Sequence, residues 1–309
     1  MNFSLACGGD AIVQRRQGIP FPICPLDQGN RSGELSQREI IRSIAAGATI
    51  KELSFQSNYV YRLLRENGDS TIVKIYATPS RERRERHAME ALLGVEGVPQ
   101  ILERGATEGY SWIRMTDGGA WNLAALPRNL ETIAKAGQIL RGIHDSKAHI
   151  TNLEGGIDGE YVVAHYKSTL DRLERYRRRL ELPAAVLDAA KSSLNQPDST
   201  APVPSHTRPK PEKFVVAEDG SMTLIGWEWA TLAPPEWDLS LATWRFSRTL
   251  GPDAAQALWD GYGARFSQER LKPWIAYHAS MAMLDAAEQR DGRLGDLNYL
   301  ITDLSSAIA

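Results

Sequence analysis

Hydrophobic and polar residues alternate along the chain from about residue 49, and a period of two predicts β-strands. Runs of β-branched and aromatic residues indicate where these strands lie. The predicted strands are 49–55, 59–65, 71–76, 98–102 and 110–115. Asn67-Gly68 between the second and third strands is typical of a tight hairpin turn, and the turn of a second hairpin is expected at 105–109. The first third of the chain therefore predicts an antiparallel sheet.

Beyond Thr116-Asp117-Gly118-Gly119 the period changes to about 3.6 residues, which predicts helices. The predicted helices are 81–93 (within the sheet region), 130–144, 159–181 and several more between 236 and 306. The order of the elements predicts an α+β fold with two lobes. We expect an irregular N-terminal extension at 1–36, a small β-rich lobe at 37–117 and a larger, mainly helical lobe at 118–309.

The composition changes this picture little. With 309 residues, 42% hydrophobic and 24% charged, the chain is typical of globular proteins. A formal net charge of −2 gives no reason to expect nucleic acid or a membrane surface as partner, and no apolar run reaches the roughly 20 residues of a membrane span. Without a signal-peptide pattern, Cys7 and Cys24 are expected to be free thiols in the cytoplasm. Two interpretations of the N-terminal extension remain open: it is a mobile arm, or its segment from Ile19 to Ile23 docks on a partner.

Lys74 stands in an otherwise apolar strand. Either it faces solvent, or it is buried and needs an anionic partner, since an unpaired buried ammonium is costly. Glu85 lies on the following helix beside its apolar stripe and is the preferred partner, with Glu82 and Glu90 as alternatives.

A histidine-led loop and two tryptophan motifs follow one another in the second half of the chain. His206 lies in the segment 204–216, Trp227-Glu228-Trp229-Ala230 lies in 224–230, and Pro235 to Leu239 comes next. In this order the chain resembles the aminoglycoside phosphotransferase and choline kinase-like family, a branch of the protein-kinase-like fold. The other stretches that carry the resemblance are Ser57 to Arg62, Ile72-Val73-Lys74, Arg84-Glu85, Val98-Pro99 and Ile143-His144.

The resemblance implies roles for individual residues. The nucleotide side of the site would be formed by Lys74, Glu85, Ser57, Asn58 and Met115. Structural roles in the large lobe would fall to His206, Asp238 and His144.

The catalytic positions depart from the family pattern. In the family, the histidine is followed by Gly-Asp, four residues and Asn, and a second Asp precedes Trp-Glu. In this chain Arg208 stands in place of the first Asp, Lys213 in place of the Asn and Gly226 in place of the second Asp. An arginine cannot serve as a base, and lysine and glycine offer no side-chain oxygen to magnesium. We therefore expect no intact catalytic residue and no metal ligand, with a degenerate catalytic loop at 204–216 and a metal-loop remnant at 224–230.

Arg208, Lys210 and Lys213 would instead form a basic cluster across the cleft from Lys74, which leaves two interpretations. Either the cleft is a relic, or it binds an anion without metal. The favoured function is a pseudokinase-like binding, scaffolding or regulatory subunit with a protein or peptide partner, and the ligand would be a small molecule or anion. ATP or another nucleotide without magnesium is the one cofactor considered. The alternative is a phosphotransferase-family enzyme of altered mechanism that acts on a small molecule or peptide, for example the kinase-like component of a two-protein dehydratase.

Overall fold

The structure is a computed structural model that describes residues 37–54, 58–107, 109–150, 156–193, 199–263, 267–288 and 298–308. The expectations for the extension 1–36, its two cysteines and Ser57 fall outside these residues. The chain forms two compact units. The first contains the described residues up to Arg86 together with Pro99–Asp117, and the second contains His87–Val98 and the chain from Gly118.

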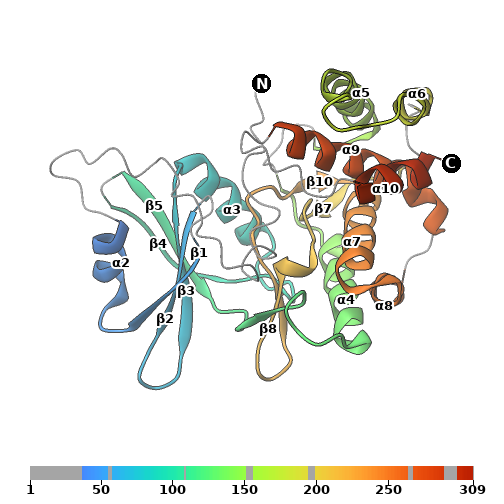
Figure 1. Ribbon diagram of the computed structural model, residues 1–309. Helices are drawn as coiled ribbons and strands as arrows, with labels where there is room; N and C mark the ends of the chain where they lie inside the picture. Colours follow the sequence, from blue (N-terminus) through green and yellow to red (C-terminus); the bar gives the residue numbers. More distant parts are fainter. Residues whose placement is uncertain are drawn as a thin grey trace. The chain divides into compact units, whose positions relative to one another are not determined.

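A five-stranded antiparallel sheet forms most of the first unit (Figure 1). Its strands are β1 (Thr49–Ser54), β2 (Asn58–Leu64), β3 (Ser70–Tyr76), β4 (Ile101–Thr107) and β5 (Tyr110–Thr116), in the order β1-β2-β3-β5-β4. Helix α2 (Gln37–Ala45) covers one face, where Ile40 and Ile41 pack in a core with Val73, Ile75 and Trp112. Helix α3 (Pro79–Ala91) follows β3. The antiparallel small lobe that the sequence predicts is present.

Strand β4 is longer than predicted. It continues through Gly105 to Thr107, where the sequence analysis placed a turn at 105–109. A Cβ atom on Gly105 would lie 2.6 Å from the ring of Trp112, so the glycine makes room for the indole on the neighbouring strand. Gly105 therefore marks a close packing contact inside the strand, and the turn comes after it.

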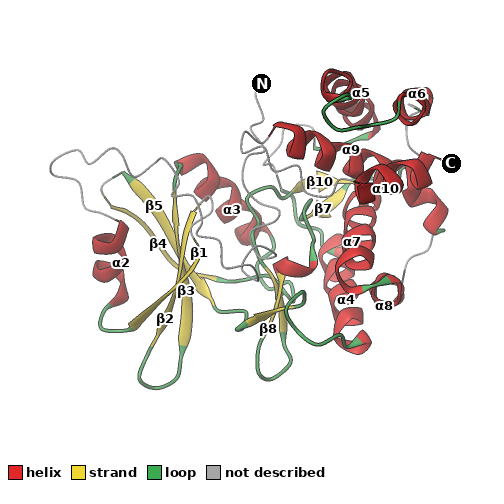
Figure 2. Cartoon of the chain, in the orientation of Figure 1, coloured by secondary structure: helices red, strands yellow, loops and turns green. Residues whose placement is uncertain are grey.

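Helices dominate the second unit (Figure 2). They are α4 (Leu130–Asp145), α5 (Gly159–Tyr176), α6 (Ala184–Ser192), α7 (Pro235–Leu250), α8 (Pro252–Tyr262), α9 (Lys272–Glu288) and α10 (Asn298–Ile308). Short elements lie between them: β6 (Trp121–Asn122), β7 (Val203–Ser205), 3₁₀-helix η3 (Pro211–Lys213), β8 (Phe214–Val216), β9 (Met222–Leu224), β10 (Thr231–Ala233) and 3₁₀-helix η4 (Gln268–Leu271). Strands β6, β8 and β9 form one small sheet, and β7 pairs with β10. None of the described helices is long and apolar enough to cross a membrane.

Helix α5 is shorter than the predicted 159–181 and ends at Tyr176. The following residues form a turn in which Leu182 N donates to Arg177 O at 3.1 Å, and Glu181 has a φ of +51°. This turn buries Leu180 and Leu182 in the large core of the unit. The burial of these two leucines outweighs the helical preference of the charged residues before them.

The segment between α3 and β4 belongs to the second unit. Gly97 O accepts a hydrogen bond from Leu224 N at 2.8 Å, and a Cβ atom on Gly97 would lie 2.7 Å from the side chain of Ile139 of α4. Residues 87–98 therefore pack with the helical unit, and Asp117 is the last residue of the first unit.

Candidate functional site

The predicted ion pair between Lys74 and Glu85 is present in the first unit. Lys74 Nζ lies 2.5 Å from Glu85 Oε2, and Glu85 is only 2% exposed. Tyr76 also donates its hydroxyl to Glu85 Oε2 at 2.9 Å, a contact that the sequence analysis missed. Residues two apart on a strand share a face, so the alternation of β3 could have indicated Tyr76. Glu82 pairs with Arg86 one turn along α3 and takes no part.

Asn58 and Met115 are both buried, at 5% exposure each. Asn58 stands opposite Tyr76 in the sheet, and its Oδ1 accepts from Ala77 N at 3.4 Å. Met115 is paired with Ile72 on one side and Ile101 on the other. The role of these two residues toward a nucleotide stays a prediction, and Ser57 lies outside the described residues.

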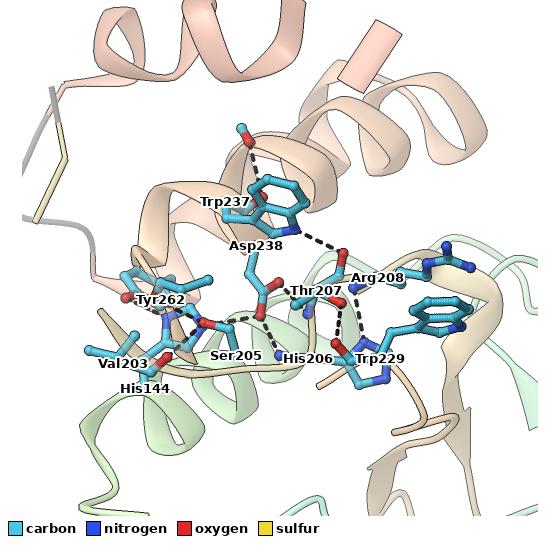
Figure 3. Close-up of polar contacts among 12 residues, drawn as sticks. His144, Val203, Ser205, His206, Thr207, Arg208, Trp229, Trp237, Asp238 and Tyr262 are labelled. Carbon is cyan, nitrogen blue, oxygen red and sulfur yellow. Dashed lines mark hydrogen bonds and ion pairs between the residues drawn. The ribbon is translucent and has the colours of Figure 1, made fainter. Parts of the chain in front are cut away.

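Asp238 of α7 fixes the backbone of the catalytic loop in the second unit (Figure 3). This fully buried carboxylate accepts from His206 N at 2.8 Å and from Thr207 N at 2.7 Å. His144 Nε2 lies 3.3 Å from the same carboxylate, and its Nδ1 lies 2.9 Å from the hydroxyl of Tyr262. The expected structural use of Asp238 and His144 is thereby visible as hydrogen bonds.

His206 is held as a neutral ring. Its Nδ1 accepts from Arg208 N at 3.2 Å, so Nε2 carries the proton and donates to Ile225 O at 3.2 Å. The edge-to-face partner of the ring is Trp227, with centroids 4.8 Å apart. Burial lowers the pKa of His206 to about 4. A neutral imidazole with two hydrogen bonds connects the loop 204–216 to the segment 224–230.

Thr207 has a φ of +66°, the left-handed conformation that a β-branched residue rarely adopts. Three contacts hold it there. Besides the bond from its N–H to Asp238, its Oγ1 donates to Trp229 O at 2.9 Å and its carbonyl accepts from Trp237 Nε1 at 3.1 Å. The loop thus keeps a turn that suits glycine while carrying threonine, and the cost in strain is offset by hydrogen bonds.

Three cations lie on the loop that follows His206. The guanidinium of Arg208 lies over the ring of Trp229, 4.4 Å from its centroid (Figure 3). Burial, together with the charges of Arg245 and Arg208, lowers the pKa of Lys210 to about 8. Lys213 Nζ would lie 3.0 Å from a Cβ atom on Gly226. The three predicted cations therefore share the loop but have different neighbours.

The residues at the two metal positions do not fit a magnesium ion. Gly226 has no side chain, its φ is +90°, and the ammonium of Lys213 stands beside it. Glu228 Oε2 is 3.6 Å from the same Cβ position, so one acid lies near the ammonium of Lys213 at this place. Magnesium takes oxygen ligands and is repelled by an ammonium. Among the described residues, no group of three or more histidine, cysteine or acidic side chains is placed to hold a metal.

Asp285 of α9 is an acid near the loop that the sequence analysis did not single out. Burial raises its pKa to about 6, although the charges of Arg208 and Lys210 act in the opposite direction. Arg245 of α7 was likewise missed. Both lie in helices far along the chain from residue 208, and a helical pattern alone does not indicate which turn faces the loop.

Comparison with known proteins decides the family. A model of the phosphotransferase enzyme family (APH) matches residues 49–274, more than half of the chain. The chain belongs to this family. No curated protein matches it. The match covers the sheet, the histidine-led loop and the tryptophan motifs on which the resemblance rests.

Solved structures agree with the two-lobed kinase-like fold. Spectinomycin phosphotransferase APH(9)-Ia, in complex with ADP and spectinomycin, has a TM-score of 0.58 at 15% identity, over 87% of this chain and 93% of its own. A choline/ethanolamine kinase family protein from Mesorhizobium loti has a TM-score of 0.58 at 17% identity, over 88% and 94%. Amicoumacin kinase hAmiN has a TM-score of 0.60 at 12% identity, over 88% and 94%. At these identities the likeness shows the fold.

Proposed function

We propose that this member of the phosphotransferase family is pseudokinase-like: it binds a ligand or partner and does not transfer phosphate from Mg-ATP. The observation that carries the proposal is the ammonium of Lys213 beside Gly226. Phosphoryl transfer in this fold uses an Asn and an Asp to hold magnesium on the phosphates. A lysine and a glycine at those positions supply a positive charge where the reaction needs two oxygen ligands.

The position of the base supports the same conclusion. Arg208 would replace the acidic residue that orients the attacking hydroxyl, and a guanidinium has no basic atom at neutral pH. Its placement over Trp229 gives it a fixed neighbour in the loop. Orientation of a substrate hydroxyl for attack would need an acceptor at this position.

Each of the two units keeps buried, well-bonded polar groups, which favours a binding role over a loss of all function. The pair of Lys74 and Glu85 is buried, and Asp238 holds two backbone N–H groups of the loop. Burying two charges costs desolvation free energy, which an apolar pair at the same place would avoid. We therefore propose a scaffolding or regulatory subunit with a protein or peptide partner, in which a nucleotide, if bound, is bound without magnesium.

The test is a turnover assay with matched binding measurements. Purified protein is incubated with Mg-ATP and spectinomycin, kanamycin or choline, and ADP release is compared with that of Lys74→Ala. We expect no turnover above the variant. ATP titrations in magnesium and in EDTA should give the same affinity or a tighter one in EDTA. Turnover that Lys74→Ala abolishes would instead support the alternative, an enzyme of altered mechanism.

A further inference from the structure

A pocket of about 190 Å³ lies in the second unit, where the chain passes from β6 into α4. Five of its eight lining residues precede α4, two belong to the first turn of α4, and one ends α7. They are Leu123, Leu126, Pro127, Arg128, Asn129, Thr132, Ile133 and Leu250. None of them belongs to the loop 204–216 or to the segment 224–230, so this pocket is separate from the site described above.

Most of the pocket wall is apolar. Leu123 and Ile133 are buried, at 4% and 1% exposure, and Leu126, Pro127 and Leu250 complete the apolar lining. Apolar walls offer few partners to water, and a cavity of about 150 Å³ lined by such side chains takes up benzene. A volume of about 190 Å³ therefore suits an apolar group the size of a leucine or phenylalanine side chain.

Arg128 gives the pocket its one charged group. Its side chain is 49% exposed, and its Nη1 lies 3.6 Å from Asp253 Oδ2 on α8. That separation is longer than a hydrogen bond, and Arg128 makes no hydrogen bond to any residue that the structure describes. A Cβ atom on Gly251 would lie 3.3 Å from the same Nη1, so the glycine between α7 and α8 leaves room for the guanidinium. The donors of Arg128 are therefore accessible to a ligand.

We infer that this pocket binds an apolar carboxylate: a branched or aromatic group fills the apolar part, and the carboxylate binds Arg128. A guanidinium presents two parallel N–H groups to a carboxylate, and such charge-assisted hydrogen bonds are stronger than neutral ones. The inference goes beyond the proposed function, because none of the residues on which that proposal rests lines the pocket.

A free apolar acid and the C-terminal residue of a polypeptide both carry this chemistry, and the surface beside the pocket favours the polypeptide. Leu130 and Trp121 are each 44% exposed, and in the chain they flank the lining residues 123–129. Five large hydrophobic side chains are exposed in the described part of the chain, and these are two of them. They offer apolar surface to the residues that precede a C-terminal carboxylate. The ligand class is therefore the apolar C-terminal end of a polypeptide.

NMR spectroscopy of the full chain, labelled at isoleucine and leucine methyl groups, tests the site. The probes are N-acetylleucine, its amide, which lacks the charge, and acetate, which lacks the apolar group. We expect N-acetylleucine to shift the methyl signals of Ile133 and Leu250 with a Kd on the order of 1 mM, as a ligand of this size allows. The amide and acetate should bind about tenfold more weakly or worse, because each lacks one of the two interactions.

Variants of the lining residues separate this site from general charge. Arg128→Gln removes the guanidinium, and Thr132→Leu places a larger side chain in the pocket from a partly exposed position. Each should weaken the binding of N-acetylleucine about tenfold. Asp253→Asn removes the acid that approaches Arg128 and should tighten binding about threefold. Arg141→Gln is the matched control, because Arg141 pairs with Asp145 at the other end of α4 and should not affect binding. Thermal melts establish that each variant is folded.

A peptide separates the two sources of the ligand. The acetylated tripeptide alanine-phenylalanine-leucine with a free carboxyl end should bind about tenfold more tightly than N-acetylleucine, because its phenylalanine reaches the exposed side chains beside the pocket. Trp121→Ala should remove part of this gain and leave the affinity for N-acetylleucine unchanged. Equal affinity of the two ligands would overturn the polypeptide as ligand and assign the pocket to a free apolar acid.

The absence of shifts at Ile133 and Leu250 would overturn the inference, and so would equal affinity in the parent, Arg128→Gln and Thr132→Leu. The turnover assay is independent of these results. Phosphate transfer would contradict the proposed function and leave this pocket standing, and a lack of binding here would leave the proposed function standing.

Discussion

Lys213 Nζ lies 3.0 Å from the point that a Cβ atom on Gly226 would occupy. A side chain at position 226 would therefore meet an ammonium, and an acidic one would form an ion pair with it before it could reach a metal. The two positions are thus coupled, and restoring one of them alone cannot restore a magnesium site.

Repair of the metal site should need substitution of Lys213 together with Gly226, and Arg208→Asp removes a further cation from the same loop. In Arg208→Asp/Lys213→Asn/Gly226→Asp, two carboxylates and an amide oxygen replace two cations and a glycine, a donor set that suits magnesium. We expect calorimetry to detect magnesium or manganese binding in this variant and none in Gly226→Asp, in which Lys213 remains. A triple variant that melts cooperatively and takes up no metal would show that the loop is aligned incorrectly.

Gly226→Ala should destabilise the protein. A φ of +90° disfavours any residue with a Cβ atom, and the strain is about 1–2 kcal/mol. Gly142→Ala is the matched control, because Gly142 lies within α4 and nothing stands within 4 Å of its added Cβ. That change should stabilise by about 0.5–1 kcal/mol. Urea unfolding of both variants measures the free energy of unfolding, and equal effects would contradict the strained conformation.

Removing one partner of the pair between Lys74 and Glu85 should be costly. Glu85→Leu or Lys74→Met leaves a buried charge without its partner, for a loss of about 3–5 kcal/mol in the free energy of unfolding. The double variant should lose less than either single variant. Glu103→Gln removes a half-exposed acid that pairs with Arg114 in the same sheet, and its effect should stay below about 1 kcal/mol. Additive losses in the double variant would argue against coupling.

Asp238→Asn should destabilise the helical unit by about 3 kcal/mol. The amide keeps one acceptor oxygen but turns an N–H toward a backbone N–H, so one charge-assisted bond becomes a repulsive contact. Asp145→Asn, which removes an exposed partner of Arg141, should change stability by less than about 0.5 kcal/mol. Chemical denaturation of the two variants provides the comparison, and similar values would leave Asp238 without a special role in the loop.

Stability should fall as the pH drops from 6.5 toward 4. Burial lowers the pKa of both His206 and His278 to about 4, so the unfolded chain binds protons in this window that the folded chain does not. Each histidine then costs about 2 kcal/mol of unfolding free energy at pH 4.5 relative to pH 7. His278→Gln should remove the contribution of His278 to this pH dependence, because glutamine does not titrate. The glutamine amide can still donate to Trp237 O. His87→Gln, an exposed change, should keep the slope of the parent.

The sequence predicted the local features that depend on periodicity and spacing. The strand alternation located β2 and β3 within one residue or so, and the apolar stripe of α3 selected Glu85 as the partner of Lys74. It failed where tertiary packing decided the outcome. Gly105 was predicted to lie in a turn, but it lies in β4, where the absence of a Cβ atom leaves room for the indole of Trp112. Helix α5 ends earlier than predicted because the turn after it buries Leu180 and Leu182.

The surroundings of the loop could be predicted only in part. The spacing from His206 to Trp227 assigns Arg208, Lys213 and Gly226 to the family's catalytic positions, and this assignment stays a prediction. Asp285 and Arg245 come from helices whose rotation about their axes depends on the whole core. Arg208, Lys210 and Lys213 lie on one loop, but each has different neighbours, and the sequence alone does not specify those neighbours.

Asp238 holds the loop through main-chain groups, so the path of the backbone does not depend on the side chains at 208, 210 and 213. Its carboxylate accepts hydrogen bonds from the main-chain N–H groups of His206 and Thr207. The hydroxyl of Thr207 donates to Trp229 O and also holds the strained turn. None of these bonds uses the side chains at 208, 210 or 213. Substitutions at those three positions can therefore change the charge of the loop while the hydrogen bonds that hold its turn remain. The main-chain bonds thus fix the path of the backbone, and the side chains on it are set separately.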